Sequence, residues 1–348
     1  MELPVPGCQR DRVGIDKSKL RTYDIIYIIV NILIYYELFR RANMKKQKKV
    51  QKRVLAIHDI SCVGKCSLTV ALPIISAAGI EVSVIPTAVL STHTGGFTGY
   101  TFRDLTDDIL PIVSHWESLN LQFDAIYTGY LGSFRQLDIM SEVFQRLGAD
   151  GAMKLVDPVM GDNGVRYPAF SDTFPAGMRK LCGKADTIVP NITEAAMLLD
   201  EPYQEGPYTQ DYVEHLLKGL GEIGPKQIVL TGVYFDDRQL GAAVYDRATG
   251  EIDYEFADRI EGYYHGTGDV FGSALVAALM RNCELKKSAS VAVDFTVRSI
   301  LRTKKAGTDI RFGVDFESGL AGLAQQLGKA GTDPAGDPGG NKEQEYGK

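Results

Sequence analysis

The sequence predicts an α/β fold in which helices cover both faces of a central, mainly parallel sheet. Short apolar runs of the length of buried strands alternate with longer stretches in which apolar residues recur at helical spacing. A polar or glycine-bearing cluster follows the end of nearly every run. The chain has 348 residues, of which 45% are hydrophobic and 24% charged, which is ordinary for a globular protein with a substantial core.

The elements follow from these patterns in chain order. Apolar runs predict strands at residues 54–57, 81–90, 125–127, 153–156, 187–189 and 227–230. Helical spacing predicts helices between them, including 68–78, 105–119 and 211–220, and Pro73 must kink the first of these or mark its true beginning. Segments 241–245 and 251–256 predict a hairpin, and we expect two further helices, one after Asp269 and one over 285–301.

The two ends of the chain differ from the rest. Residues 25–39 are apolar but shorter than the roughly 20 residues that span a bilayer, and a basic run follows them, the order expected of an N-terminal anchor. The sequence from Met44 also resembles the natural start of a cytoplasmic protein. We therefore favour the interpretation that the segment before it is an artefact of start-site choice over the interpretation that it is a membrane anchor. We therefore expect an apolar and basic extension over 1–50, one folded domain over 51–325, and a disordered tail rich in Gly, Pro and charge over 326–348.

Charge and cysteine usage narrow the class of partner. The net charge of -6 does not indicate a basic surface for nucleic acid, so we expect a small-molecule partner and no nucleic acid. The five cysteines show no disulfide framework, which indicates a reducing cytoplasm. Cys62 and Cys66 lack a second pair of ligands nearby, so packing is the expected role for them rather than metal binding.

The polar clusters are expected to converge in space. They surround residues 59, 93, 130, 157, 194, 231 and 269, and each follows the carboxyl end of a predicted strand. In open α/β sheets the ligand crevice lies at that edge of the sheet. The sequence therefore predicts one site that is built from segments far apart in the chain.

The sequence Gly266-Thr267-Gly268-Asp269 enters the predicted buried helix. A helix N-terminus offers free N–H groups and the positive end of the dipole, which suits a developing negative charge. Asp269 beside it can accept a proton, and the chemistry indicated is transfer of an anionic group to a hydroxyl. The alternative is that Asp269 only caps the helix.

Three acids are expected near this motif: Asp157, Asp162 and Glu194. Converging carboxylates repel each other unless a cation sits among them, and Mg²⁺ takes one or two carboxylates together with waters and phosphate oxygens. These parts suit phosphoryl transfer. The alternative is that each acid caps the helix after its strand. The sequence contains neither a Walker-type phosphate loop nor a G-x-G-x-x-G fingerprint.

The motifs Asp157-Pro158-Val159-Met160-Gly161-Asp162, Pro190-Asn191-x-x-Glu194 and Gly266-Thr267-Gly268-Asp269 resemble, in order and spacing, the pyridoxal kinase branch of the ribokinase-like superfamily. The likeness runs from about residue 54 to about residue 301. It implies a three-layer α/β/α fold and an ATP-dependent kinase that phosphorylates the hydroxymethyl group of pyridoxal, pyridoxine or pyridoxamine. The partners implied are a B6 vitamer, ATP, Mg²⁺, in some relatives a monovalent cation such as K⁺, and a second copy of the chain in a homodimer.

The resemblance also implies roles for matched residues. Asp269 would accept the hydroxyl proton, residues 266–268 would form the anion hole, and Asp157 and Glu194 would organise Mg²⁺ and the phosphates.

Further matched residues would contact the two ligands. Asn191 and Thr231 would contact the nucleotide, and Asp162 would lie on a loop near it. Tyr130 would lie beside the pyridine ring, and His93-Thr94 would close the substrate pocket.

One position departs from the family pattern. Near the end of the first strand the family commonly has a serine, where this chain has Asp59 followed by Ser61. A carboxylate there favours a protonated pyridine or an amine-bearing substrate, so we expect a preference for pyridoxamine or a broad B6 range. Two alternatives stay open: a hydroxymethylpyrimidine kinase of thiamin synthesis, in which cysteine usually replaces Asp269, and a non-catalytic B6-binding protein.

Overall fold

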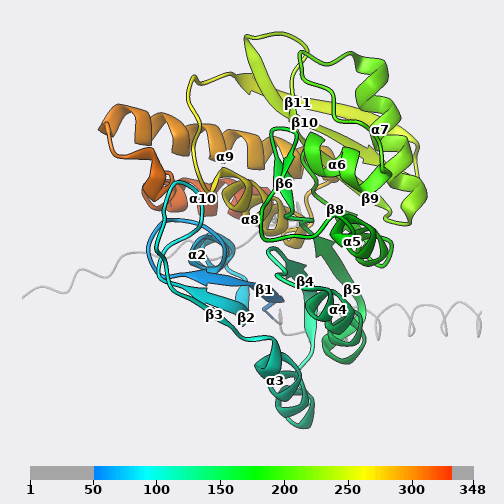
Figure 1. Cartoon of the computed structure of the whole chain (residues 1–348). Helices are drawn as coiled ribbons and strands as arrows, with labels where there is room; N and C mark the ends of the chain where they lie inside the picture. Colours follow the sequence, from blue (N-terminus) through cyan, green and yellow to red (C-terminus); the bar gives the residue numbers. More distant parts are fainter. Residues whose placement is uncertain (1–50, 331–348) are drawn as a thin grey trace, which may run out of the picture. The chain divides into compact units, whose positions relative to one another are not determined.

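The structure is a computed structural model that describes residues 51–330 (Figure 1). The extension predicted over 1–50 and the last part of the predicted tail, 331–348, lie outside the described residues. Within the described part of the chain, no helix is long and apolar enough to cross a membrane.

The predicted central sheet is present and mainly parallel. The strand order is β11-β10-β9-β8-β5-β4-β1-β2-β3, and all neighbours from β9 through β2 pair in parallel. The edge pairs β2–β3, β9–β10 and β10–β11 are antiparallel. The strands are β1 (Arg53–Ser61), β2 (Glu81–Leu90), β3 (Phe102–Asp104), β4 (Phe123–Thr128), β5 (Gly148–Val156), β8 (Thr187–Ile188), β9 (Gln227–Val233), β10 (Gln239–Asp246) and β11 (Glu251–Asp258).

Helices cover the sheet on both faces, so the predicted three-layer fold is confirmed. Successive strand residues point to opposite faces: Leu55 packs in one core cluster and Val54 in the other. One face carries α3 (Thr106–Ser118), α4 (Phe134–Leu147), α5 (Phe174–Cys182), α6 (Ile192–Leu199) and α7 (Gln210–Ile223). The other face carries α2 (Leu68–Ala77), α8 (Thr267–Met280), α9 (Leu285–Ala306) and α10 (Leu320–Ala330).

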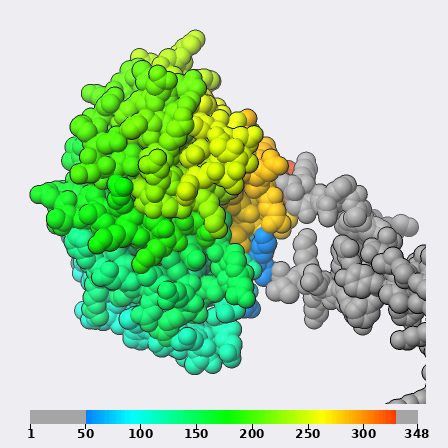
Figure 2. All heavy atoms as spheres, turned by 90° about the vertical axis from the view of Figure 1, so that its right-hand side faces the viewer, coloured from blue at the N-terminus to red at the C-terminus, as the bar shows by residue number. Residues whose placement is uncertain are grey.

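The predicted hairpin is present, and it extends the main sheet. Strands β10 and β11 continue the sheet beyond β9, and helix α9 packs against both of them. Figure 2 shows this region from the side, where the yellow segment around β11 lies at the surface between the green segment before it and the orange helix α9. The segment that leaves β11 leads directly to the start of α8.

Three details differ from expectation. Helix α2 begins at Leu68, so Pro73 lies inside the helix and does not mark its beginning. The two-stranded sheet of β6 (Gly161–Asp162) and β7 (Val165–Arg166) was not predicted, since strands of two residues carry no periodicity. The predicted start of the tail at residue 326 is wrong, because α10 continues to Ala330 and Leu327 is buried. Two short 3₁₀ helices, η1 (Ile310–Phe312) and η2 (Glu317–Gly319), precede α10.

Candidate active site

Helix α8 begins at the glycine-containing motif, as predicted. Gly266 is the N-cap residue in the left-handed region with φ 75°, so no side chain caps the first turn. A methyl group on Gly266 would lie 2.0 Å from the backbone oxygen of Lys65. Only glycine permits both this conformation and this approach. The N–H groups of the first turn, which have no acceptor one turn earlier in the helix, are thus available to an anion.

Asp269 lies in the first turn of α8 but is not its cap, since Gly266 holds that position. The pKa of Asp269 is raised to about 7, mainly by burial and also by the nearby charge of Asp59, while a hydrogen bond from the Ser67 backbone N–H opposes the rise. A carboxylate with a pKa near neutrality is suited to accept a proton at physiological pH. The alternative of a purely capping Asp269 does not match this geometry.

Asp59 lies beside Asp269 and is buried. Its two carboxylate oxygens accept hydrogen bonds from Ser67 Oγ at 2.5 Å and Ser61 Oγ at 3.1 Å. Burial raises the pKa of Asp59, while both serine hydrogen bonds and His93 lower it. Ser67 has φ 54°, an uncommon value for a residue with a side chain, and it contacts both acids through its N–H and its hydroxyl. This strained residue therefore fixes the spacing of the two carboxylates.

Asp157 and Glu194 form a second acidic pair next to Asp269. Both are buried, and burial, then Glu194, then Asp269 hold the pKa of Asp157 well above its ordinary value. Burial also raises the pKa of Glu194 to about 8. Glu194 closes a capping box with Asn191 and accepts a hydrogen bond from Met160 N at 3.0 Å. The capping alternative for Glu194 is thus confirmed, and its carboxylate keeps lone pairs for a further partner.

Asp162, the third predicted acid, lies close enough to Glu194 that its charge adds to the effect of burial in raising the pKa of Glu194. The Asp162 carboxylate accepts a hydrogen bond from Tyr263 Oη at 2.9 Å and another from the Asn163 N–H. Among residues 51–330, no group of three His, Cys, Asp or Glu side chains is arranged to hold a metal ion. Asp157 and Glu194 are left as a pair, which suffices for Mg²⁺ if waters and phosphate oxygens complete the shell.

The predicted nucleotide contacts adjoin this pair. Asn191 caps α6, donates from Nδ2 to the Gly161 oxygen at 2.9 Å, and forms an isolated parallel bridge with Thr231. Asn191 therefore bonds to the β6–β7 hairpin through its side-chain amide and to β9 through its backbone. Its predicted contact with a nucleotide stays a prediction.

The predicted substrate residues lie around Asp59. Tyr130 is half-buried with its ring 5.7 Å from that of Phe170, and burial, then the charge of Asp59, raises the pKa of Tyr130 to about 12. Thr94 is exposed. His93 is buried, and its Nδ1 accepts a hydrogen bond from Gly95 N at 3.1 Å. The ring hydrogen must then be on Nε2, which donates to the backbone oxygen of Arg311 at 2.6 Å.

Residues 309–317, here called the C-terminal strap, were not predicted to belong to the site. The strap bonds to two substrate loops: Arg311 to His93, and the backbone oxygen of Phe312 to the N–H of Lys65 at 3.1 Å. Lys65 Nζ also pairs with Glu317 at 2.8 Å. The strap lies more than 200 positions from these loops, and no local pattern indicates such contacts.

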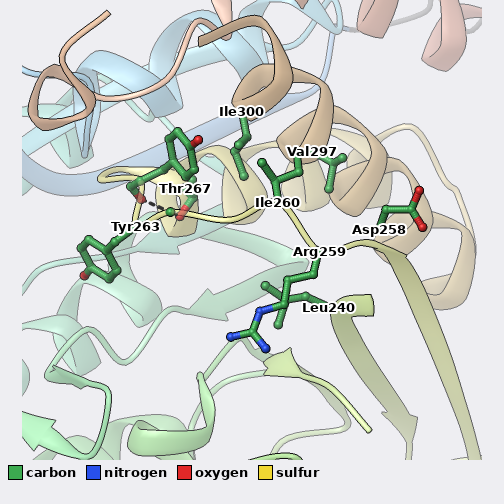
Figure 3. A pocket seen from close by; sticks show the side chains of 10 residues that line it. Leu240, Asp258, Arg259, Ile260, Tyr263, Thr267, Val297 and Ile300 are labelled. Carbon is green, nitrogen blue, oxygen red and sulfur yellow. Dashed lines mark hydrogen bonds between the residues drawn. The ribbon is translucent and has the colours of Figure 1, made fainter. Parts of the chain in front are cut away.

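A small cavity of about 190 Å³ also escaped prediction. It lies between the end of the β10–β11 hairpin, the segment before α8, and helix α9 (Figure 3). The side chains of Ile260, Val297 and Ile300 gather beside Thr267, whereas the guanidinium of Arg259 points away from them. The cavity therefore lies between these apolar side chains and the first turn of α8.

The fold and this site define a ribokinase-like phosphotransferase: a parallel sheet between helical layers, with an uncapped helix N-terminus and a carboxylate at the ends of its strands. The chain belongs to the phosphomethylpyrimidine kinase family, whose model matches residues 75–312. The predicted resemblance to pyridoxal kinases and the predicted enzyme class, a phosphotransferase with an alcohol group as acceptor, are confirmed.

Several individual proteins are similar to the chain. Pyridoxal kinase from Lactobacillus plantarum is 33% identical with a TM-score of 0.73, and the match covers 79% of this chain and 97% of that one. A crystal structure from Bacteroides thetaiotaomicron, named as a phosphomethylpyrimidine kinase and solved with pyridoxal, is 38% identical with a TM-score of 0.75, covering 78% and 96%. Pyridoxal kinase from Arabidopsis thaliana is 26% identical over 271 residues, covering 74% and 85%.

Proposed function

We propose that this enzyme transfers the γ-phosphate of ATP to the hydroxymethyl group of a B6 vitamer, giving the 5'-phosphate. The observation that carries the proposal is the carboxylate of Asp269, with a pKa of about 7, in the uncapped first turn of α8 and next to buried Asp59. The carboxylate thus has the uncapped helix N-terminus and the carboxylate of Asp59 as neighbours.

The reaction needs a base and a place for negative charge. Asp269 takes the proton of the hydroxymethyl group, and the oxygen of that group attacks the γ-phosphorus in line while the bond from the γ-phosphorus to the β,γ-bridging oxygen breaks and ADP leaves. The N–H groups of the first turn of α8, at residues 266–268, stabilise charge on the transferring phosphoryl group. The approach of Gly266 to Lys65 keeps this turn at a fixed distance from the substrate loop.

Asp157 and Glu194 fit a magnesium ion. They are two buried carboxylates whose mutual repulsion a cation would relieve, and within residues 51–330 neither forms an ion pair with a basic side chain. When bound, Mg²⁺ would neutralise charge on the nucleotide phosphates. Magnesium and potassium dependence, the homodimer and the cytoplasmic location stay predictions.

The cavity beside Thr267 is proposed as the site of the nucleotide base. At about 190 Å³ it is smaller than the roughly 300 Å³ at which ligand pockets begin, so it suits one part of a ligand. Its apolar walls, Ile260, Val297 and Ile300, suit a flat heterocycle. A base held there would direct its phosphates toward the N-terminus of α8.

Asp59 is proposed to favour pyridoxamine, because a buried carboxylate favours a cationic amine over an aldehyde or an alcohol. The test compares kcat/KM for the three vitamers in wild type and in Asp59→Ser, with Asp59→Asn as the isosteric control. We expect the preference for pyridoxamine over pyridoxal to fall about tenfold in both variants, the loss typical of one charge-assisted hydrogen bond. An unchanged ratio would show that Asp59 does not select the vitamer.

The family name supports one other acceptor, hydroxymethylpyrimidine. The acid at Asp269, where those kinases usually have cysteine, favours the B6 vitamers. Release of ADP from MgATP, measured with each vitamer and with hydroxymethylpyrimidine, decides between them. Asp269→Ala should lower the rate about 10²–10⁴-fold, the usual contribution of a general base, whereas Asp138→Ala on the exposed face of α4 should leave it unchanged. A higher rate with hydroxymethylpyrimidine than with any vitamer would overturn the proposal.

A further inference from the structure

A buried tyrosine of the central sheet faces the acidic pair without a hydrogen-bond partner. Tyr127 is the residue before the last in β4, and its side chain is fully buried. Among residues 51–330 no group lies in hydrogen-bond geometry with its hydroxyl, and the neighbouring hydroxyl of Ser273 on α8 is likewise unpaired. Unpaired buried hydroxyl groups are rare in folded proteins, and each one calls for an explanation, such as an ordered water or a functional role.

Gly272 on α8 shows where this hydroxyl points. A methyl group on Gly272 would lie 2.5 Å from the phenol oxygen of Tyr127 and 3.7 Å from Asp157 Oδ2. Both oxygens therefore lie near the same point on the helix. The absence of a side chain at position 272 leaves the space for this arrangement.

The phenol can act only as a donor toward a carboxylate. Burial first, and then the charges of Asp157 and Asp269, hold the pKa of Tyr127 well above its ordinary value, so the hydroxyl keeps its proton. An ionised carboxylate is an acceptor at both oxygens. Among the neighbours of Asp157, Glu194 and Asp269 repel it, and the phenol is the neutral group that can orient it.

We propose that Tyr127 is a positioning residue: its hydroxyl donates through one ordered water to the carboxylate of Asp157 and fixes the direction in which that carboxylate meets a magnesium–nucleotide complex. The inference rests on the proposed function, since Asp157 has this task only in a kinase. It assigns a role at the active site to a residue in the core of the sheet.

Tyr127→Phe is the direct test, because it removes only the hydroxyl. Tyr212→Phe is the matched control: the hydroxyl of Tyr212 is also buried and unpaired, but its ring stacks on Tyr208 at 5.9 Å, in a cluster that includes none of the catalytic acids. Each substitution keeps the ring and its packing, and neither hydroxyl has a protein partner to lose, so the thermal midpoint of both variants should stay close to that of wild type. A merely structural role predicts no further effect.

The positioning role predicts a kinetic effect at Tyr127 alone. In the full-length chain, kcat with MgATP and pyridoxal should fall about tenfold in Tyr127→Phe, with the KM for pyridoxal unchanged. Calorimetric binding of MgADP, measured without vitamer, should weaken several-fold. Tyr212→Phe should match wild type in both measurements.

A double-mutant cycle with Asp157→Asn tests whether Tyr127 acts through Asp157. If it does, Tyr127→Phe causes no further loss of MgADP affinity in the Asp157→Asn background. An equal loss in both backgrounds, or wild-type kcat and affinity in Tyr127→Phe, would overturn the inference. A wild-type chain that phosphorylates no B6 vitamer would instead overturn the proposed function, and the MgADP cycle would still decide the role of Tyr127.

Discussion

Replacing Asp269 by Asn should abolish phosphoryl transfer and stabilise the fold at the same time. Asn has the size of Asp, so packing at the start of α8 is kept while the charge and the base are lost. Catalytic residues commonly lower the stability of the fold, because their charged groups are poorly solvated in the active site. The carboxylate of Asp269 is such a residue, with its pKa raised mainly by burial.

The structure sets the size of the effect. A rise of the Asp269 pKa from 3.8 to about 7 corresponds to at most roughly 4 kcal/mol of unfolding free energy. The side chain is only half-buried, and solvent screening reduces this to about 1–2 kcal/mol. The sign follows from proton binding: the native state holds this proton more tightly than the unfolded chain. The contribution to stability is therefore complete below about pH 4 and is lost as the pH rises to about 7.

Urea unfolding of wild type and Asp269→Asn at pH 5 and pH 8 measures this difference, with Asp138→Asn as the control on the exposed face of α4. The advantage of Asp269→Asn should be larger at pH 8 than at pH 5, and Asp138→Asn should show no such change. In wild type, kcat/KM should rise with pH and level off above about 7, as the base becomes ionised. A variant less stable than wild type at pH 8, or an advantage independent of pH, would refute the reasoning.

Two other substitutions probe the anion site and the cavity. Gly266→Ala should destabilise the fold by clearly more than Gly250→Ala and should abolish activity; both glycines have φ near 75°, but a methyl group at 250 meets nothing within 4 Å, whereas at 266 it meets the Lys65 oxygen at 2.0 Å. Urea unfolding should give about 1–2 kcal/mol for Gly250→Ala, the cost of the left-handed conformation alone. Val297→Arg should raise the KM for ATP at least tenfold and leave the KM for the vitamer unchanged, and steady-state kinetics with each substrate varied checks this.

Much of the fold was predictable, because strands and helices of ordinary length carry their periodicity in the sequence. The parallel strands, the hairpin and helix α8 appear where the apolar pattern placed them. The prediction that polar clusters converge also held. Asp59, Asp157 and Glu194 lie around Asp269 because Asp59 lies near the end of β1, the other two follow β5 and β8, and these parallel strands end at one edge. Strands of two residues, as in β6 and β7, contain no such signal.

The finer geometry was not predictable, because it depends on contacts between distant segments. The hydrogen bond that Asp162 accepts from Tyr263, 101 positions further along, has no signal in the sequence. Tyr127 belongs to an apolar strand and resembles core in the sequence; only the approach of Gly272 shows that its hydroxyl faces Asp157. The strained backbone of Ser67, which joins Asp59 to Asp269, has no sequence signature either.

The C-terminal strap gives a physical reason why the substrate loops can hold a buried charge. Asp59 and Asp269 repel each other and lie in poor solvent, so their loops would tend to separate unless other contacts hold them. The strap provides these contacts on both sides, through Lys65 in one loop and His93 in the other. Two of the contacts are accepted by backbone oxygens of the strap and a third is the ion pair of Lys65 with Glu317, so both the path of the strap and one of its side chains hold the loops. The strap therefore helps to keep the two acids close together, which contributes indirectly to the raised pKa of Asp269.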